Sequence, residues 1–159
     1  LKGDVVDEKV ETTVDLKIDS YIPSEYISNE NIRLEIYKKI SVIESEEDYS
    51  DLIDELIDRF SDIPKEVTNL MDISLLRFNA SHAKINSIVQ KNENYEFKLS
   101  FVTELTLINE LTDQFKNIKL SLGKEAGFTI SKLKYPIEDL KKAVELINLH
   151  KNYTSKEKS

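Results

Sequence analysis

The stretch from residue 45 to residue 60, SEEDYSDLIDELIDRF, constrains the fold of this chain more than any other segment. Its apolar residues recur at the spacing i, i+3, i+4, i+7, i+8 and i+11, which places them on one side of an α-helix. Ser45 followed by Asp48 is typical of a helix start, because a serine caps the first turn and an acid suits the positive end of the helix dipole. The segment therefore predicts an amphipathic helix that buries one side: Tyr49, Leu52, Ile53, Leu56, Ile57 and Phe60.

The opposite side of this helix is acidic. With about 100° per residue, four carboxylates lie together away from the apolar side: Asp51, Asp54, Glu55 and Asp58. Two pairs of them are spaced i,i+4, where like charges repel by about 0.2–0.5 kcal/mol per pair in an isolated helix. Residues 44–62 hold nine acids and a single base. Such a pattern fits a solvated helix face, and it also fits an electrostatic docking face for a basic partner.

Two further helices flank this segment. Residues 29–43 place isoleucines and a tyrosine on one side, and only a short turn separates them from residue 45, which predicts an antiparallel helix pair. Pro64 suits an early helical position, which does not need its N–H, so a third helix is expected from about residue 64 to residue 83. Apolar residues cover much of its circumference, so we expect it to be the most enclosed of the three.

The rest of the chain mixes strands with helices. Three glycines and three prolines in 159 residues favour long helices over a turn-rich β-sandwich. Period-two alternation predicts strands, and an apolar spacing of three to four predicts helices. The expected elements are a half-buried strand at 13–19, a hairpin of strands 85–90 and 95–101, a helix at 105–115, strands at 118–122 and 128–130 around a turn at 123–127, and a helix at 136–149.

These elements predict an α+β fold. An N-terminal strand and a three-helix unit are followed by a small, mostly antiparallel sheet with one or two helices. We expect residues 1–11 to be a linker from an upstream region and residues 12–150 to be one domain. Its helical part covers about 28–83 and its α/β part about 84–150, and the polar residues 151–159 are expected to form a disordered tail.

Charge and composition exclude several classes of function. Residues 1–80 carry 20 acids and 9 bases, a net −11, whereas residues 81–159 carry 10 acids and 13 bases, a net +3. Without a basic stripe, direct binding of DNA or RNA is disfavoured, since phosphate binding needs clustered lysine and arginine. Cysteine is absent, and no run approaches the roughly 20 apolar residues of a membrane span. We expect a cytoplasmic protein with no membrane partner.

The usual signatures of catalysis are missing from the sequence. It contains no GxxxxGK[ST], GxGxxG, HExxH or EF-hand pattern, and Gly123 and Gly127 enclose too few residues for a phosphate loop. His82 and His150 are best interpreted as surface or helix-end residues. Carboxylates along one helix spread over too great a distance to converge on a metal. We therefore predict no catalytic residue, cofactor site or metal site.

Several short motifs follow one another in a characteristic order. They are IDSYIP at 18–23, YI at 26–27, RLEIYK at 33–38, ELIDRF at 55–60 with Pro64 four residues on, and NL at 69–70. Together they resemble the C-terminal (TRCF) domain of bacterial transcription-repair coupling factors (Mfd). The resemblance covers about residues 12–90, and the second half only through its order of elements. Where the family usually continues with glycine after DRF, this chain has Ser61, so the turn before Pro64 is expected to differ.

The resemblance implies a regulatory domain at the end of a large ATP-driven DNA translocase that removes stalled RNA polymerase from damaged DNA. ATP and Mg²⁺ would belong to translocase domains outside this chain, so this fragment is not expected to be an enzyme or to hold a cofactor. The region of the polypeptide upstream of the expected linker would then be the translocase.

The resemblance also implies a partner. In the family this domain docks on the UvrB-like N-terminal module of the same polypeptide and masks the surface that binds UvrA until RNA polymerase is engaged. Glu55 and Asp58 of the ELIDRF motif are the best candidates for contacts to that module, and Asp51, Asp54 and Arg59 complete the hypothetical interface. A free-standing acidic adaptor for a basic protein is the alternative, and a carboxylate-based enzyme is a weaker one.

Overall fold

The computed structural model describes residues 9–121 and 126–151, and the chain falls into two compact units. The helical unit is Lys17–Phe78, and the sheet unit is Leu1–Leu16 together with Asn79–Ser159. The division after Phe78 lies inside a continuous helix, whereas the sequence suggested a boundary near residue 83. The expected linker residues 1–8, part of the turn at 123–127 and the expected tail residues 152–159 lie outside the described residues.

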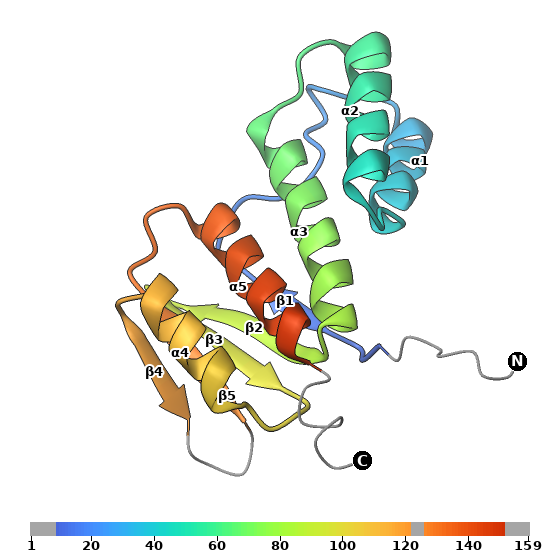
Figure 1. Cartoon of the computed structure of the whole chain (residues 1–159). Helices are drawn as coiled ribbons and strands as arrows, with labels where there is room; N and C mark the ends of the chain where they lie inside the picture. Colours follow the sequence, from blue (N-terminus) through green and yellow to red (C-terminus); the bar gives the residue numbers. More distant parts are fainter. Residues whose placement is uncertain (1–8, 122–125, 152–159) are drawn as a thin grey trace, which may run out of the picture. The chain divides into compact units, whose positions relative to one another are not determined.

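Three helices build the helical unit: α1 Glu30–Ser41, α2 Glu46–Phe60 and most of α3 Lys65–His82 (Figure 1). Asn29 caps α1 by accepting a hydrogen bond from the Ile32 N–H at 3.0 Å. Ser45 caps α2 in the same way, because its hydroxyl accepts from the Asp48 N–H at 3.0 Å. The three helices lie within two residues of the ranges predicted from periodicity.

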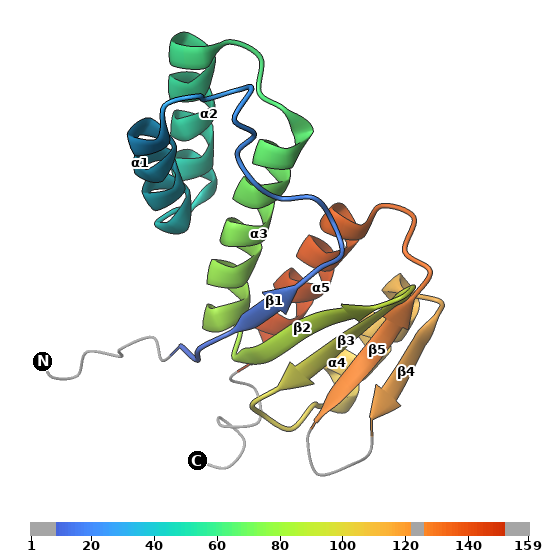
Figure 2. The same ribbon diagram turned by 180° about the vertical axis from the view of Figure 1, so that it is seen from behind.

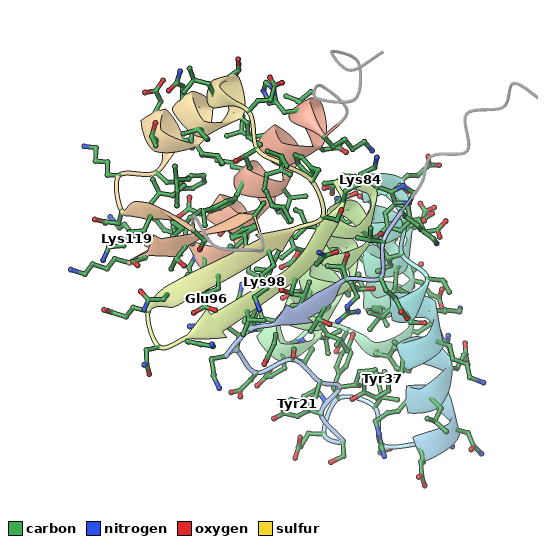
Figure 3. All side chains as sticks on the ribbon, turned by 90° about the horizontal axis from the view of Figure 1, so that it is seen from below. Tyr21, Tyr37, Lys84, Glu96, Lys98 and Lys119 are labelled. Carbon is green, nitrogen blue, oxygen red and sulfur yellow. The ribbon has the colours of Figure 1, made fainter. Side chains whose placement is uncertain are left out.

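The apolar sides of these helices form one core. Ser61 ends α2 with a φ of 78° and a ψ of −152°, a backbone conformation that favours glycine and that turns the chain toward α3. Tyr37 (Figure 3) accepts a hydrogen bond from the Ile22 N–H at 2.9 Å, which ties the loop before α1 to the helix. The buried core residues are Ile22, Ile27, Ile36, Ile40, Ile43, Leu52, Leu56, Val67, Met71 and Leu75.

The sheet unit contains a five-stranded sheet in the order β1-β2-β3-β5-β4. Its strands are β1 Thr13–Asp15, β2 Ile85–Lys91, β3 Asn94–Leu99, β4 Ile118–Ser121 and β5 Gly127–Ser131. All neighbours pair antiparallel except β1, which pairs parallel with β2. The strand predicted at 13–19 is therefore too long, because the chain leaves the sheet after Asp15 to enter the helical unit.

Two helices cover one face of this sheet, α4 Leu105–Gln114 and α5 Pro136–His150 (Figures 1 and 2). Phe97 and Phe128 stack beneath them with ring centroids 4.5 Å apart. Glu96 and Lys98 alternate with the buried residues of β3 and lie on the other face (Figure 3). The predicted α+β fold is confirmed.

None of the helices in the described ranges carries a stretch long and apolar enough to cross a membrane.

Candidate docking site

The outer side of α2 carries a line of carboxylates. Glu47, Asp51, Asp54 and Asp58 are exposed, and their spacing places them on the side of the helix opposite the buried Leu52 and Leu56. Within residues 9–121 and 126–151, none of these four acids forms an ion pair. We call these four residues the acidic face, and its charges are available to a partner.

Glu55 and Arg59 have a different role. The Glu55 carboxylate lies 2.6 Å from the Lys39 ammonium and 2.7 Å from the Arg59 guanidinium. Glu35 on α1 completes the group, at 3.1 Å from Arg59 and 3.5 Å from Lys39. Two acids and two bases thus form a charge-balanced network that bridges α1 and α2.

Each charge in this network stabilises its neighbours. The pKa of the Glu55 carboxyl is lowered most by a hydrogen bond from Lys39 and further by one from Arg59. A hydrogen bond from Arg59 also lowers the pKa of Glu35. The hydrogen bond to Glu55 raises the pKa of Lys39. The guanidinium of Arg59 also lies 4.9 Å from the ring centroid of Phe60, which restricts it further. The charges of Glu55 and Arg59 are therefore balanced mainly by ion pairs within the helical unit.

The network predicts a pH dependence of stability. A glutamate whose pKa is lowered by folding stabilises the native state above its unfolded pKa of about 4.3, and this contribution is lost as the pH falls through the lowered folded pKa. Between about pH 5 and pH 3, the urea midpoint should therefore fall less in Glu35→Gln/Glu55→Gln than in the parent chain. Asp113→Asn/Glu145→Gln, which alters two exposed acids of the sheet unit, is the matched control. Parallel acid dependence in all three chains would contradict a stabilising role for the network.

The five interface residues predicted from the sequence thus divide into two groups. Asp51, Asp54 and Asp58 share the acidic face, whereas Glu55 and Arg59 turn toward α1. Sequence reasoning missed Glu35 and Lys39, although their i,i+4 spacing is the usual signal of an ion pair on a helix. Their ion-pair partners on α2 could not be identified without knowing how the two helices pack together.

A shallow pocket opens beside the acidic face. It has a volume of about 250 Å³, and three acidic residues, Asp48, Asp51 and Glu55, contribute to its lining. The other lining residues are Lys39, Val42, Ile43 and Leu52. In the part of the chain that the structure describes, no group of three or more histidine, aspartate or glutamate side chains is arranged to hold a metal ion. The arrangement favours electrostatic contact with a basic surface.

The chain is similar to several proteins of one kind. A family model described as the TRCF domain matches residues 16–109, more than half of the chain and the whole of α2. A transcription-repair-coupling factor of Staphylococcus haemolyticus is 37% identical over 137 residues, which cover 82% of this chain and 12% of that protein. The Staphylococcus aureus (strain USA300) protein of the same name is 44% identical over 93 residues, 58% of this chain and 8% of that protein.

A solved structure shares the fold. The crystal structure of the C-terminal domain of a transcription-repair coupling factor matches with a TM-score of 0.79 at 24% identity, over 92% of this chain and 97% of that chain. The match extends the similarity of fold into the sheet unit, which the family model covers only in part. This chain spans about an eighth or less of the length of the curated relatives it matches.

Proposed function

This chain belongs to the TRCF domain family, and from that membership we propose that it is the regulatory C-terminal domain of a transcription-repair coupling factor. In this proposal its acidic face docks on the UvrB-like N-terminal module of the same polypeptide. The docked domain covers the surface to which UvrA binds, and engagement of RNA polymerase releases it. The activity of the whole protein, an ATP-dependent DNA translocase, resides in other domains.

One observation carries the proposal: Asp51, Asp54 and Asp58, which form no ion pair with another described residue, lie along one helix whose other side is buried. Like charges at i,i+4 destabilise an isolated helix slightly, so their accumulation on α2 is better explained by a partner than by helix stability. The opposite side of α2 is buried in the core, which fixes the helix backbone that carries these side chains. A helix that is already formed loses little backbone entropy when it meets a complementary surface.

Docking within one polypeptide makes weak contacts effective. A linked domain meets its partner at an effective concentration set by the linker, which reaches the millimolar range for short flexible linkers. Exposed ion pairs of about 0.2–1 kcal/mol each are then enough to keep the closed arrangement populated. The same modest strength allows another binding event to open it.

The proposal predicts binding that depends steeply on salt. This chain, mixed with the separately purified N-terminal module of its full-length protein, should bind at about 50 mM NaCl and lose at least about tenfold in affinity at about 500 mM, because salt screens exposed charges. Isothermal titration calorimetry measures both constants. Asp51→Asn/Asp54→Asn/Asp58→Asn should weaken the low-salt affinity, whereas Glu93→Gln/Asp113→Asn/Glu145→Gln, with the same loss of charge in the sheet unit, should not.

The acidic adaptor is the competing function, since the same acidic face suits a separate basic protein. No detectable association with the N-terminal module at low salt would favour the adaptor and reject intramolecular docking. Association that is insensitive to salt and to the three aspartates would place the contact elsewhere on the domain.

A further inference from the structure

The sheet unit contains a second pocket, remote in sequence from the acidic helix and of opposite charge. It has a volume of about 140 Å³ and lies between the α4–β4 connection and the β5–α5 connection. Three lysines line it, Lys116, Lys132 and Lys134. The remaining lining residues are Gln114, Phe115, Asn117, Ile130, Ser131, Leu133 and Asp139.

The lysines of this pocket are not balanced by ion pairs within the part of the chain that the structure describes. All three lysines are exposed, and none forms an ion pair with another described residue. The one carboxylate of the lining, Asp139, accepts a hydrogen bond from the Tyr135 N–H at 3.3 Å and so caps the start of α5. Three positive charges and one negative charge leave a local net charge of +2.

Hydrogen bonds hold the two connections together. The Ser131 N–H donates to the Asn117 carbonyl at 2.8 Å, which joins the end of β5 to the start of β4. The Lys132 N–H donates to the Glu93 carbonyl at 3.0 Å, and Lys132 has a left-handed backbone with a φ of 58°. Residues other than glycine rarely adopt this conformation, so the contacts around Lys132 hold its backbone in it. The backbone at Ser131 and Lys132 is therefore held in place, although the lysine side chains are long.

We propose that this pocket binds a phosphate group. Lysine is a point charge that suits phosphate, and the side-chain amides of Gln114 and Asn117 add further N–H donors. Its volume of about 140 Å³ is large enough for a single phosphate group. The shared chemistry is the phosphate group, supplied either by a small phosphate compound or by a nucleic-acid backbone. This site is independent of the docking proposed for the acidic face.

A titration of the full chain with inorganic phosphate tests the site. At constant ionic strength, amide signals of residues 114–117 and 130–134 should shift together in nitrogen–proton NMR spectra and saturate. Lys116→Gln/Lys132→Gln/Lys134→Gln should weaken binding by about tenfold, as expected from the loss of three exposed charge contacts. The matched control is Lys38→Gln/Lys65→Gln/Lys142→Gln, which removes three exposed lysines outside the pocket and should leave the affinity unchanged.

Each outcome decides for or against the site. The proposal would be overturned if both triple variants bound phosphate equally weakly, or if chloride shifted the amide signals as much as phosphate does. Either result would show that only the net charge of the chain matters. Tighter binding of a glutamate-rich peptide than of phosphate would also overturn it and assign the pocket to an acidic protein segment.

A short single-stranded oligonucleotide that binds more tightly than phosphate through the three lysines would identify the nucleic-acid backbone as the source, and equal binding would identify small phosphate compounds. The single variant Lys116→Gln, with about a threefold loss, serves as a second measurement should the triple variant unfold.

Discussion

Replacing Asp54 and Asp58 with lysine in the full-length protein is expected to raise the capture of UvrA about tenfold. In the proposed docking, each substitution would remove an attraction to a basic surface of the N-terminal module and introduce a repulsion. A loss of only about 1.4 kcal/mol from the closed arrangement changes the open population tenfold. Because both side chains are exposed and form no ion pair with described residues, the domain should fold as before.

The choice of Asp54 and Asp58 follows from the network at Glu55. The resemblance pointed to Glu55 and Asp58, but Glu55→Lys would place a third base beside Lys39 and Arg59 with only Glu35 to balance them. Such a variant would loosen α1 from α2 and confuse docking with unfolding. Asp54 lies four residues before Asp58 on the acidic face, outside that network.

Pull-down of purified UvrA by the full-length variant measures the effect, and circular dichroism verifies the fold. The matched control is Asp113→Lys/Glu145→Lys, which reverses two exposed charges of the sheet unit and should leave UvrA capture unchanged. Unchanged capture by Asp54→Lys/Asp58→Lys with a native spectrum would show that the acidic face is not the clamp. Equal increases in both variants would point to net charge instead of a specific surface.

Truncating the buried side of the same helix should have the largest effect on stability. Leu56 is 0% exposed and lies in the core of the helical unit, whereas its neighbour Ile57 is 50% exposed. Leu56→Ala should lower the free energy of unfolding by about 2–5 kcal/mol, because it removes buried methyl groups and leaves a cavity. Ile57→Ala should change it by no more than about 0.5 kcal/mol.

Urea unfolding followed by circular dichroism compares the two variants, which remove aliphatic side chains from adjacent positions of one helix. A cost for Ile57→Ala as large as that for Leu56→Ala would mean that Ile57 is covered in solution, for example by a second copy of the chain. Repeating the measurement at several protein concentrations distinguishes that case, since association makes stability depend on concentration.

Much of the fold was predictable because its signals are local. The period of α2 and its Ser45 cap indicated the correct helix, and the alternation on both sides of residues 91–94 indicated the β2–β3 hairpin. The exception on α2 was Ile57, which was assigned to the buried side. It lies at the border of the apolar side, where only the arrangement of the neighbouring helices decides exposure.

The candidate docking site was predictable only in part. Periodicity grouped the carboxylates of α2 but did not separate Glu55 from Asp51, Asp54 and Asp58. That separation depends on Glu35 and Lys39, which α1 brings to one flank of α2. The lysine pocket escaped sequence reasoning altogether, because its residues come from two connections about 15 positions apart that meet through the β4–β5 pairing.

By itself, the sequence determined which segments form helices and strands and where acidic charge accumulates, since both depend on neighbours within a few residues. Only the tertiary structure decided the placement of β1, which pairs Thr13 with Ser87 in parallel although the whole helical unit lies between them in the sequence. It also decided which charges of α2 are balanced internally. Strand pairing and ion pairing between helices join residues distant in the chain, so no local pattern encodes them, and the packed core determines which groups meet.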